Sequence, residues 1–306
     1  LTPAGAQPMF SHCGRYVMVY NGEVYNAEEL RRELAPRGIN WRGHSDTEAM
    51  LEACVAWGVE AASKKFIGMF AFALWDRQER RLWLVRDRLG IKPVYYAVDQ
   101  HRLVFGSELK ALAVTPGWKP AIDEDAVAGY MRHGYVAQPR TIYRNVWKLP
   151  PGHILSIAPK GEATLESFWD LRPFAMAGAR NVDGQVDMVE EEEKLDRLLR
   201  DAVSRRMIAD VPLGAFLSGG IDSSTVVALM QASSTRPVRT FSIGFREQEF
   251  DESSHARAVA KHLGTDHTEF FVEPQHALDV VPKLPEWYDE PFADSSQIPT
   301  YLVSSL

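Results

Sequence analysis

The sequence contains few cysteines, little excess charge and no long apolar run. Two of its 306 residues are cysteine, so we expect no disulfide framework, and a reducing cytoplasm is the expected compartment. The net charge of −7 at pH 7 argues against nucleic acid as the main partner. No apolar run approaches the ~20 residues that span a bilayer, and no signal peptide is visible. We therefore expect no membrane partner.

The length and composition are ordinary for a globular protein. The chain is 45% hydrophobic and 25% charged, and 306 residues are enough for two domains with their own cores. It begins at Leu1 instead of Met and stops at Leu306 inside a segment with helical character. We therefore expect the sequence to be a fragment of a longer chain.

The most informative stretch runs from residue 213 to residue 230. Leu213 to Leu217 is a short apolar run and predicts a buried strand. Ser218-Gly219-Gly220 breaks this pattern, and the segment from Asp222 has the apolar spacing of a helix. A strand, a glycine-rich turn and a helix start form a geometry that holds phosphate, since free N–H groups at the helix N-terminus point at the anion.

Two readings of this turn remain open from its residues alone. Asp222 or Ser223 could serve only as a helix N-cap, and the glycine pair only as a tight turn. The turn is not a Walker loop, because no Gly-Lys-Ser/Thr follows the glycines. If it binds phosphates, Asp222 requires a cation between its carboxylate and the anion, which indicates Mg2+.

The second half of the chain alternates strands and helices. Strands are predicted at 213–217, 238–243 and 267–272, with helices from 222 and over 256–263. An acidic cluster at 190–193 precedes a further amphipathic helix, whose apolar positions include Leu195, Leu198, Leu199 and Val203. This order predicts a doubly wound parallel sheet, with ligands at the carboxyl ends of the strands.

The first half is richer in strands. Strands are predicted at 17–20, 68–75, 81–85, 94–97 and 103–106, the second and third joined by a polar turn at 76–80. Asn21-Gly22 after the first strand suits a tight turn that needs φ > 0. Capping boxes at 26–29 and 45–48 each predict a helix start, the first with Asn26 as the cap.

Several longer motifs occur in an order that resembles one enzyme family. They are YNGEVYN (Tyr20 to Asn26), SDTE (Ser45 to Glu48), GMFAFALWD (Gly68 to Asp76), RDRLGIKPVYY (Arg86 to Tyr96), SELKAL (Ser107 to Leu112) and KLPPGH (Lys148 to His153). SGGIDS at Ser218 to Ser223 resembles the PP-loop of the N-type ATP pyrophosphatases. Together they resemble the glutamine-dependent asparagine synthetases, which place a PP-loop synthetase domain after a class II glutaminase domain.

The resemblance implies a fold and a domain plan. The fold would be an N-terminal Ntn-hydrolase-type αββα sandwich followed by a doubly wound parallel α/β PP-loop domain, of the adenine nucleotide alpha hydrolase-like kind. We expect a glutaminase domain at 1–172, a linker at 173–189 and a C-terminally truncated synthetase domain at 190–306. In this family the glutaminase nucleophile is an N-terminal cysteine, which would lie in sequence before Leu1. Cys13 is then an ordinary turn residue and Cys54 a core residue.

The resemblance also assigns the glutamine site. Asn21 and Gly22 match the family's oxyanion hole, with one side-chain amide and one backbone N–H as donors. Glu23 and Asp46 match the positions that hold the α-amino group of glutamine. Local alternatives are a hairpin turn for Asn21-Gly22 and a helix-dipole partner for Asp46.

For the second domain the resemblance implies a site for ATP and Mg2+. Leu217 and Ile243 are the expected adenylate wall, and Asp222 the expected metal ligand. Asp289 to Ser296 resembles a stretch near the acceptor pocket, although its acidic residues could equally cap helices. Asp251-Glu252 after Phe250 also fits the family pattern, but could simply start the next helix. The full ATP-binding set is Leu217, Ser218, Gly219, Gly220, Asp222, Ser223, Ser224 and Ile243.

The implied activity is an ATP-dependent ligase reaction. A carboxylate, aspartate first among the candidates, would be adenylated with release of pyrophosphate, and ammonia from glutamine would then displace AMP. A related amidotransferase acting on a sugar acid, a peptide or another carboxylate stays open, as does a non-catalytic regulatory relative. The implied partners are glutamine, ATP and the acceptor, and a homodimer is left open.

Overall fold

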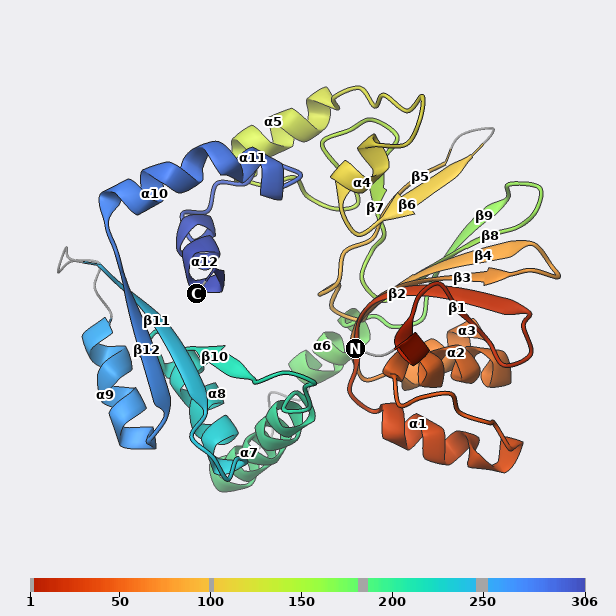
Figure 1. The fold of residues 1–306 in the computed structure, drawn as a ribbon. Coiled ribbons are helices and arrows are strands. Elements are labelled where there is room, and N and C mark those ends of the chain that lie inside the picture. The colour runs from red at the N-terminus through yellow and green to blue at the C-terminus, as the bar shows by residue number, and fades with distance from the viewer. Residues whose placement is uncertain (1–2, 99–101, 181–186, 246–252, 306) are drawn as a thin grey trace. The chain divides into compact units, whose positions relative to one another are not determined.

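The computed structural model describes residues 3–98, 102–180, 187–245 and 253–305. The chain divides into two compact units (Figure 1). Unit 1 comprises Leu1–Gly184 together with Asp289–Phe292, and unit 2 comprises Gln185–Tyr288 together with Ala293–Leu306. A short piece of the second half of the chain therefore belongs to the first unit.

Unit 1 contains two antiparallel sheets. The first has the order β1-β2-β3-β4-β8-β9 and the second the order β6-β5-β7. The strands of the first are β1 (Met9–Phe10), β2 (Tyr16–Val24), β3 (Gly68–Asp76), β4 (Arg81–Arg86), β8 (His153–Ile157) and β9 (Ala163–Ser167). Those of the second are β5 (Tyr95–Val98), β6 (Leu103–Gly106) and β7 (Trp147–Lys148). The expected hairpins β3–β4 and β5–β6 are confirmed.

The helices of unit 1 lie in two groups along the chain. The first group is η1 (Pro3–Gly5), α1 (Ala27–Leu34), η2 (Ala35–Arg37), α2 (Asp46–Trp57) and α3 (Val59–Lys65). The second is α4 (Leu109–Ala113), α5 (Glu124–His133) and α6 (Arg172–Arg180). Helix α6 occupies part of the segment that we expected to be an irregular linker.

The buried residues of unit 1 form three layers of core. Phe70 and Phe72 of β3 pack with Leu30 and Met50 of the first helical group, and Phe66 meets Phe70 edge to face at 5.6 Å. Ala71, Ala73 and Leu84 on the opposite face of that sheet pack with Val94 and Leu149. Leu109, Leu112 and Ala126 of α4 and α5 cover Ala97 of the second sheet. A layer of helices, two sheets and a second layer of helices pack in that order. The expected αββα sandwich is therefore confirmed.

Two local expectations in unit 1 are wrong. The strand does not turn at Asn21-Gly22: β2 continues to Val24, with Gly22 opposite Phe70 of β3. Gly22 has φ +151, and a Cβ there would collide with the Met69 carbonyl oxygen, so the glycine serves close strand approach. Asn26 does not cap α1 through its side chain. Its amide instead bonds Lys65 O and Ile67 N across the fold. The Ser45 cap of α2 is confirmed.

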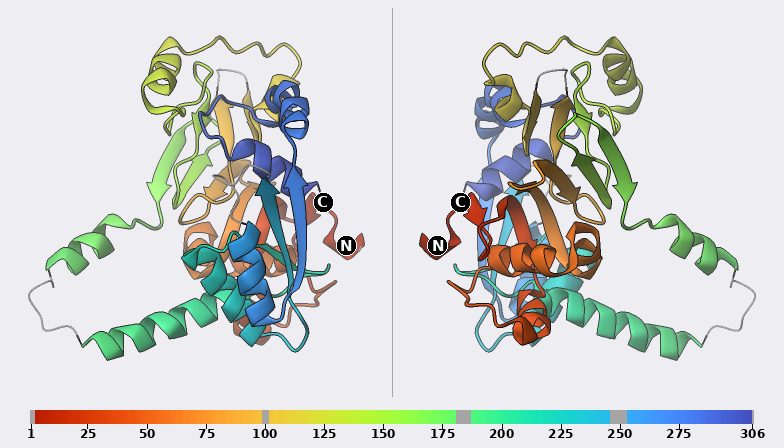
Figure 2. Two further views of the ribbon diagram at one scale, coloured as in Figure 1. Left: turned by 90° about the vertical axis from the view of Figure 1, so that its left-hand side faces the viewer. Right: turned by 90° about the vertical axis from the view of Figure 1, so that its right-hand side faces the viewer.

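Unit 2 is built on a parallel sheet of β10 (Gly214–Phe216), β11 (Arg239–Phe245) and β12 (Asp266–Val272). Strands β11 and β12 lie side by side in the same direction (Figure 2). Its helices are α7 (Met188–Arg205), α8 (Ile221–Ala232), α9 (Ser253–Leu263), α10 (Pro274–Val280), η3 (Val281–Lys283), α11 (Leu284–Trp287) and α12 (Gln297–Ser304). The predicted parallel α/β alternation is confirmed.

The expectation that β10 is a buried strand is only partly correct. In the described sheet β10 lies at an edge, and Phe216 is 57% exposed, whereas Leu217 directly after it is 1% exposed. Apolar sequence alone does not distinguish an edge strand from a central one. Across the described ranges, no helix has both the length and the apolar character needed to cross a bilayer.

Candidate functional site

The edge of β2 that faces away from β3 carries directed backbone donors. Tyr20 N donates to Gln7 Oε1 at 2.6 Å and Val24 N donates to Asp46 Oδ2 at 2.9 Å. The next residue, Tyr25, donates instead toward the β3 side, to Ile67 O. Because N–H directions alternate along a strand, the Gly22 N–H points to the same open edge as those of Tyr20 and Val24.

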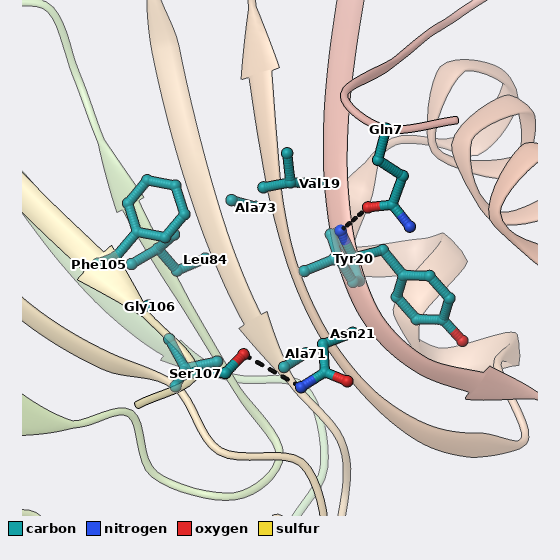
Figure 3. A pocket seen from close by; sticks show the side chains of 12 residues that line it. Gln7, Val19, Tyr20, Asn21, Ala71, Ala73, Leu84, Phe105, Gly106 and Ser107 are labelled. Atoms are coloured by element: carbon teal, nitrogen blue, oxygen red, sulfur yellow. Dashed lines mark hydrogen bonds between the residues drawn. The ribbon is translucent and has the colours of Figure 1, made fainter. Parts of the chain in front are cut away.

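The side chain of Asn21 lies on the sheet face that turns toward the second sheet. It lines a cavity of about 190 Å3 (Figure 3). Its Nδ2 donates to Ser107 Oγ at 3.1 Å, which fixes the amide orientation. An amide nitrogen carries two hydrogens, so one donor remains for another acceptor. Valine, alanine, leucine and phenylalanine side chains make up most of the remaining wall.

Asp46 links the start of α2 to this strand edge. Its Oδ2 accepts from Val24 N and from the Tyr20 hydroxyl at 2.7 Å, and its Oδ1 accepts from Thr47 N at 2.7 Å. Burial, together with the Asp46 carboxylate beside it, raises the pKa of Tyr20, so the phenol stays a donor. Glu23 shares the strand face of Asn21 by alternation. The four expected glutamine-site residues therefore meet at one end of β2.

The two cysteines have contrasting surroundings. Cys54 is 2% exposed within the first core, and burial raises the pKa of its thiol, so it is a core residue as expected. Cys13 is exposed, with its Sγ 3.3 Å from Ser11 Oγ in the turn before β2.

In unit 2, the glycine loop leads into an open helix N-terminus. Gly220 is the N-cap of α8 and supplies no side-chain cap, while Ser224 N is the first amide to bond back, to Gly220 O. The amides of residues 221–223 thus lack the helical partners that later residues have. Ser224 Oγ is buried without a hydrogen-bond partner among the described atoms. A buried orphan hydroxyl beside free amides suits an anion with several acceptor oxygens.

The loop itself is held by its serines and by one obligatory glycine. Ser218 Oγ lies 2.9 Å from Ser223 Oγ, and Ser223 Oγ donates to Gly220 O at 3.2 Å. Gly219 has φ +83, and a Cβ there would lie 2.7 Å from Ala256 N of α9. Only glycine permits both this conformation and this approach.

A cavity of about 290 Å3 adjoins the loop at the carboxyl ends of β10 and β11. Four residues of the expected ATP set line it, namely Leu217, Ser218, Ser223 and Ile243. Gly219, Gly220, Asp222 and Ser224 lie on the adjacent loop and first turn of α8 and not in the wall. The sequence prediction missed a further part of the wall, which Pro299, Thr300 and Val303 of α12 supply together with its N-cap residue Ser296. The only sequence signal for it was the motif that ends at Ser296.

Asp289 caps a helix, one of the two roles considered for the acidic residues of this motif, whereas Glu290 binds a loop amide. Asp289 Oδ2 accepts from Leu109 N at 2.5 Å, at the start of α4, and Glu290 Oε1 accepts from Ile142 N at 2.7 Å. Both partners belong to unit 1, as do Asp289 and Glu290 themselves. Asp251-Glu252, also considered, lies outside the described residues.

The residues present fit a magnesium ion that binds one protein carboxylate and takes its other ligands from phosphates and water. Asp222 is an exposed carboxylate in the first turn of α8. Among the described residues, no group of three His, Cys, Asp or Glu side chains gathers to hold a metal. Mg2+ in nucleotide sites uses one or two carboxylates plus phosphates and water, so a single aspartate beside an anion site is a suitable donor set.

Comparisons with known proteins cover both units. A family model described as a glutamine amidotransferase domain matches residues 1–169, and one described as asparagine synthase matches residues 194–306. The chain is 37% identical to glutamine-hydrolyzing asparagine synthetase 1 of Bacillus subtilis, over 98% of this chain and 46% of that protein. It is 36% identical to a putative asparagine synthetase of Methanocaldococcus jannaschii, over 95% of this chain and 55% of that protein.

One relative that is not named an asparagine synthetase is also similar over most of this chain. The amidase chry2 of Gibberella zeae is 32% identical over 87% of this chain and 40% of that protein. The chain thus spans about half the length of the curated relatives it matches.

Proposed function

Because the chain belongs to the glutamine amidotransferase domain family and its second part matches the asparagine synthase family, we propose that it is part of a glutamine-hydrolysing asparagine synthetase. The natural protein adenylates a carboxylate, aspartate first among the candidates, with ATP and amidates it with ammonia from glutamine. The expected products are the amide, AMP, pyrophosphate and glutamate. The low cysteine count supports a reducing cytoplasm as its compartment.

The observation that carries this proposal is the anion site at the start of α8. Free amides at residues 221–223 and the orphan Ser224 hydroxyl lie beside a cavity walled by Leu217 and Ile243. An apolar slot next to phosphate-binding amides suits an adenine nucleotide, with the base in the slot and the phosphates at the helix end. These donors stabilise pyrophosphate as charge moves onto the leaving group.

Asp222 is the proposed ligand for Mg2+, which when bound neutralises the phosphates. Its position in the first turn of α8 places a carboxylate next to the proposed phosphate amides. The Ser218 and Ser223 hydroxyls are hydrogen-bonded to each other, so they keep the loop in its conformation before a ligand binds.

The edge of β2 supports a glutaminase role for unit 1. The free hydrogen of Asn21 Nδ2 and the Gly22 N–H are the proposed donors to the tetrahedral oxygen formed during glutamine hydrolysis. Glu23 and Asp46 are the proposed partners of the glutamine α-amino group. The Tyr20 hydroxyl and Val24 N–H fix the Asp46 carboxylate in place.

A second acceptor class is favoured by one observation. The relative named amidase chry2 matches most of this chain, although its name does not mention asparagine. The alternative is therefore the same ATP and glutamine chemistry with a carboxylate other than aspartate.

An exchange experiment tests the proposal. The natural full-length protein is incubated with ATP, labelled pyrophosphate and one carboxylate at a time, and exchange of label into ATP is measured. Aspartate-dependent exchange in wild type, lost in Asp222→Asn, is the expected result. Exchange supported only by another carboxylate would favour the alternative, and no exchange with any carboxylate would refute both.

A further inference from the structure

Unit 1 contains a cavity of about 420 Å3 that shares no lining residue with the cavity at Asn21. Residues of α1 and of the segment 41–44 before α2 line most of it, and none of them belongs to the expected glutamine or ATP sets. The volume lies in the range of small-molecule sites, about 300–1,000 Å3. Its charged and aromatic lining residues are Glu28, Arg31, Arg32, Trp41, Arg42 and His44.

Arg31 is the buried cation of this cavity. Its side chain is 9% exposed, and its Cζ lies 4.2 Å from the centroid of the Trp41 ring. Its Nη2 donates to Ser45 O at 3.0 Å, so the ring and this bond fix the plane of the guanidinium. Its Nε is buried and has no hydrogen-bond partner among the described residues. A buried cation with an unused N–H costs free energy, and an anion in the cavity would offset that cost.

The two carboxylates near Arg31 compensate its charge only weakly. Glu48 lies 3.9 Å from Arg31 Nη2, beyond hydrogen-bond distance. Its Oε1 accepts from Arg42 N and Nε, and its Oε2 accepts from Gly43 N. Glu28 Oε1 lies 3.8 Å from Arg31 Nε, and its side chain is 76% exposed, so water screens its charge. The pair with Glu48 thus explains Arg42 but leaves Arg31 without a bonded counter-ion.

Arg32 adds an exposed cation whose donors are mostly unused. Its Nε donates weakly to Glu28 O at 3.4 Å, and nothing else in the described part of the chain bonds or pairs with its guanidinium. Arg32 therefore has no structural partner that would explain its place in the wall. Three guanidinium groups face two carboxylates around the cavity, which leaves the wall with an excess of positive charge.

This wall suits a phosphate group. Guanidinium groups bind phosphate and carboxylate oxygens through charge-assisted hydrogen bonds. A phosphate monoester carries a charge of about −1.5 to −2 at pH 7 and has three acceptor oxygens, so it can bond several guanidinium groups at once. A single carboxylate has two oxygens and one charge, and would leave more of these donors unused.

We propose that this cavity, which we name the arginine pocket after Arg31, Arg32 and Arg42, binds a small molecule that carries a phosphate monoester. Arg32 and Arg42 donate to the phosphate oxygens, and the buried charge of Arg31, held against Trp41, attracts the phosphate into the cavity. The inference goes beyond the proposed function and does not depend on it, because no residue of the pocket is assigned to glutamine, ATP or Mg2+.

Chemical footprinting of arginines tests the pocket in the natural full-length protein. Phenylglyoxal modifies accessible arginines, and mass spectrometry identifies which ones have reacted. Arg32 is the reporter, and Arg37 is the matched control, because it is also exposed but does not line the pocket. The probe is glycerol phosphate, and inorganic phosphate, succinate and glycerol are the comparison compounds.

We expect glycerol phosphate at ten times its dissociation constant to slow the modification of Arg32 about tenfold and to leave Arg37 unchanged. Inorganic phosphate should protect Arg32 at higher concentration, and succinate and glycerol should not protect it. A phosphate bound at the loop before α8 would not protect Arg32, so the two sites are distinguished.

Titration calorimetry of variants provides the second measurement. Arg32→Gln removes one charged donor and should weaken the binding of glycerol phosphate about tenfold or more. Arg37→Gln should stay within about twofold of wild type, since it changes a residue away from the pocket. Arg31→Gln should abolish binding. Arg31 is buried, so Arg32→Gln at its exposed position decides the question if Arg31→Gln does not fold.

Four results would overturn the inference. Arg32 could remain unprotected by glycerol phosphate, or Arg37 could be protected equally. Succinate could protect Arg32 as well as glycerol phosphate does, which would indicate attraction of any anion. Finally, Arg32→Gln could bind glycerol phosphate as tightly as wild type. Loss of the proposed ligase activity would change none of these measurements, so failure of the proposed function is distinguishable.

Discussion

Single glycines decide how closely backbones approach in both units. Gly22 lets β2 lie against β3, and Gly219 lets the loop before α8 lie against the start of α9. Sequence analysis identified Gly219 because the motif places it there. It misread Gly22, because Asn-Gly is also the strongest short turn signal and nothing local shows that a neighbouring strand needs the space.

The loop offers a matched pair of glycine substitutions. A Cβ at Gly219 would combine φ +83 with a 2.7 Å approach to Ala256 N, whereas at Gly220 the nearest atom is Ser218 Oγ at 3.4 Å. We expect Gly219→Ala to destabilise unit 2 by about 2 kcal/mol or more, since the left-handed conformation alone costs about 1–2 kcal/mol. Gly220→Ala should cost less than about 1 kcal/mol.

Calorimetric unfolding of the two variants measures this difference. The Gly219→Ala transition is expected several degrees below that of Gly220→Ala. Equal transitions would show that the loop does not need its left-handed residue.

Among the elements, those with strong local patterns were predicted and those set by distant contacts were not. The β3–β4 hairpin and helix α8 follow apolar periodicity and were placed correctly. At the open edge of β2 the acceptors of the backbone N–H groups are Gln7 and Asp46. Both lie outside the strand in sequence, so the pattern of the strand itself does not predict them. Leu195 and Leu198 have helical spacing in α7 but are exposed in the structure. Spacing gives a helix face, but tertiary packing decides which residues are covered.

The turn between β3 and β4 carries an electrostatic prediction. Arg15 Nε lies 2.9 Å from both carboxylate oxygens of Asp76, and the N–H groups of Gln78 and Glu79 donate to Oδ1. The Arg15 guanidinium first, and then the turn amides, lower the pKa of Asp76, although burial opposes them. A lowered native pKa adds stability above the ordinary value of about 3.9, and this stability is lost as pH falls through the native pKa.

Asp76→Asn should therefore lower the free energy of unfolding at pH 7. It should also make that free energy depend less on pH in the acidic range. We expect a loss of about 2 kcal/mol at neutral pH, the size of hydrogen bonds to a charged group. Below pH ~3.9 the difference from wild type should shrink as the wild-type carboxylate becomes protonated. Urea unfolding of both proteins from pH 7 downward measures it, and a constant difference at all pH values would contradict the ionic explanation.

At the scale of the whole molecule, two chemistries are assigned to two separately packed units. The order of the motifs between Tyr20 and Ser223 predicted this plan, because each of these motifs lies within one unit. What the sequence did not predict is that Asp289–Phe292 belongs to the first unit. The motif around these residues suggested an acceptor pocket or a helix cap, and the helix it caps lies far away in sequence.

The two activities should therefore separate by nitrogen source. Asn21→Ala is expected to lower glutamine-dependent synthesis by about 10²–10³-fold, as for other oxyanion donors, while ammonia-dependent synthesis persists. Asp222→Asn is expected to abolish AMP formation with both sources and to leave basal glutamine hydrolysis. Steady-state kinetics of the full-length variants with glutamine and with ammonia measure this. Near wild-type AMP formation by Asp222→Asn would exclude its role at the phosphates.

The cap that Asp289 places on α4 also has a consequence for the growing polypeptide. The helix and the residue that completes it are 180 positions apart. Ribosomes add about 5–20 residues per second, so α4 waits roughly 10–40 s after its own synthesis before Asp289 is made. Throughout that interval the nascent unit 1 lacks the residue that caps this helix. Under the proposed function, glutamine hydrolysis that depends on this helix would begin only after much of unit 2, the proposed site of ammonia consumption, has been translated.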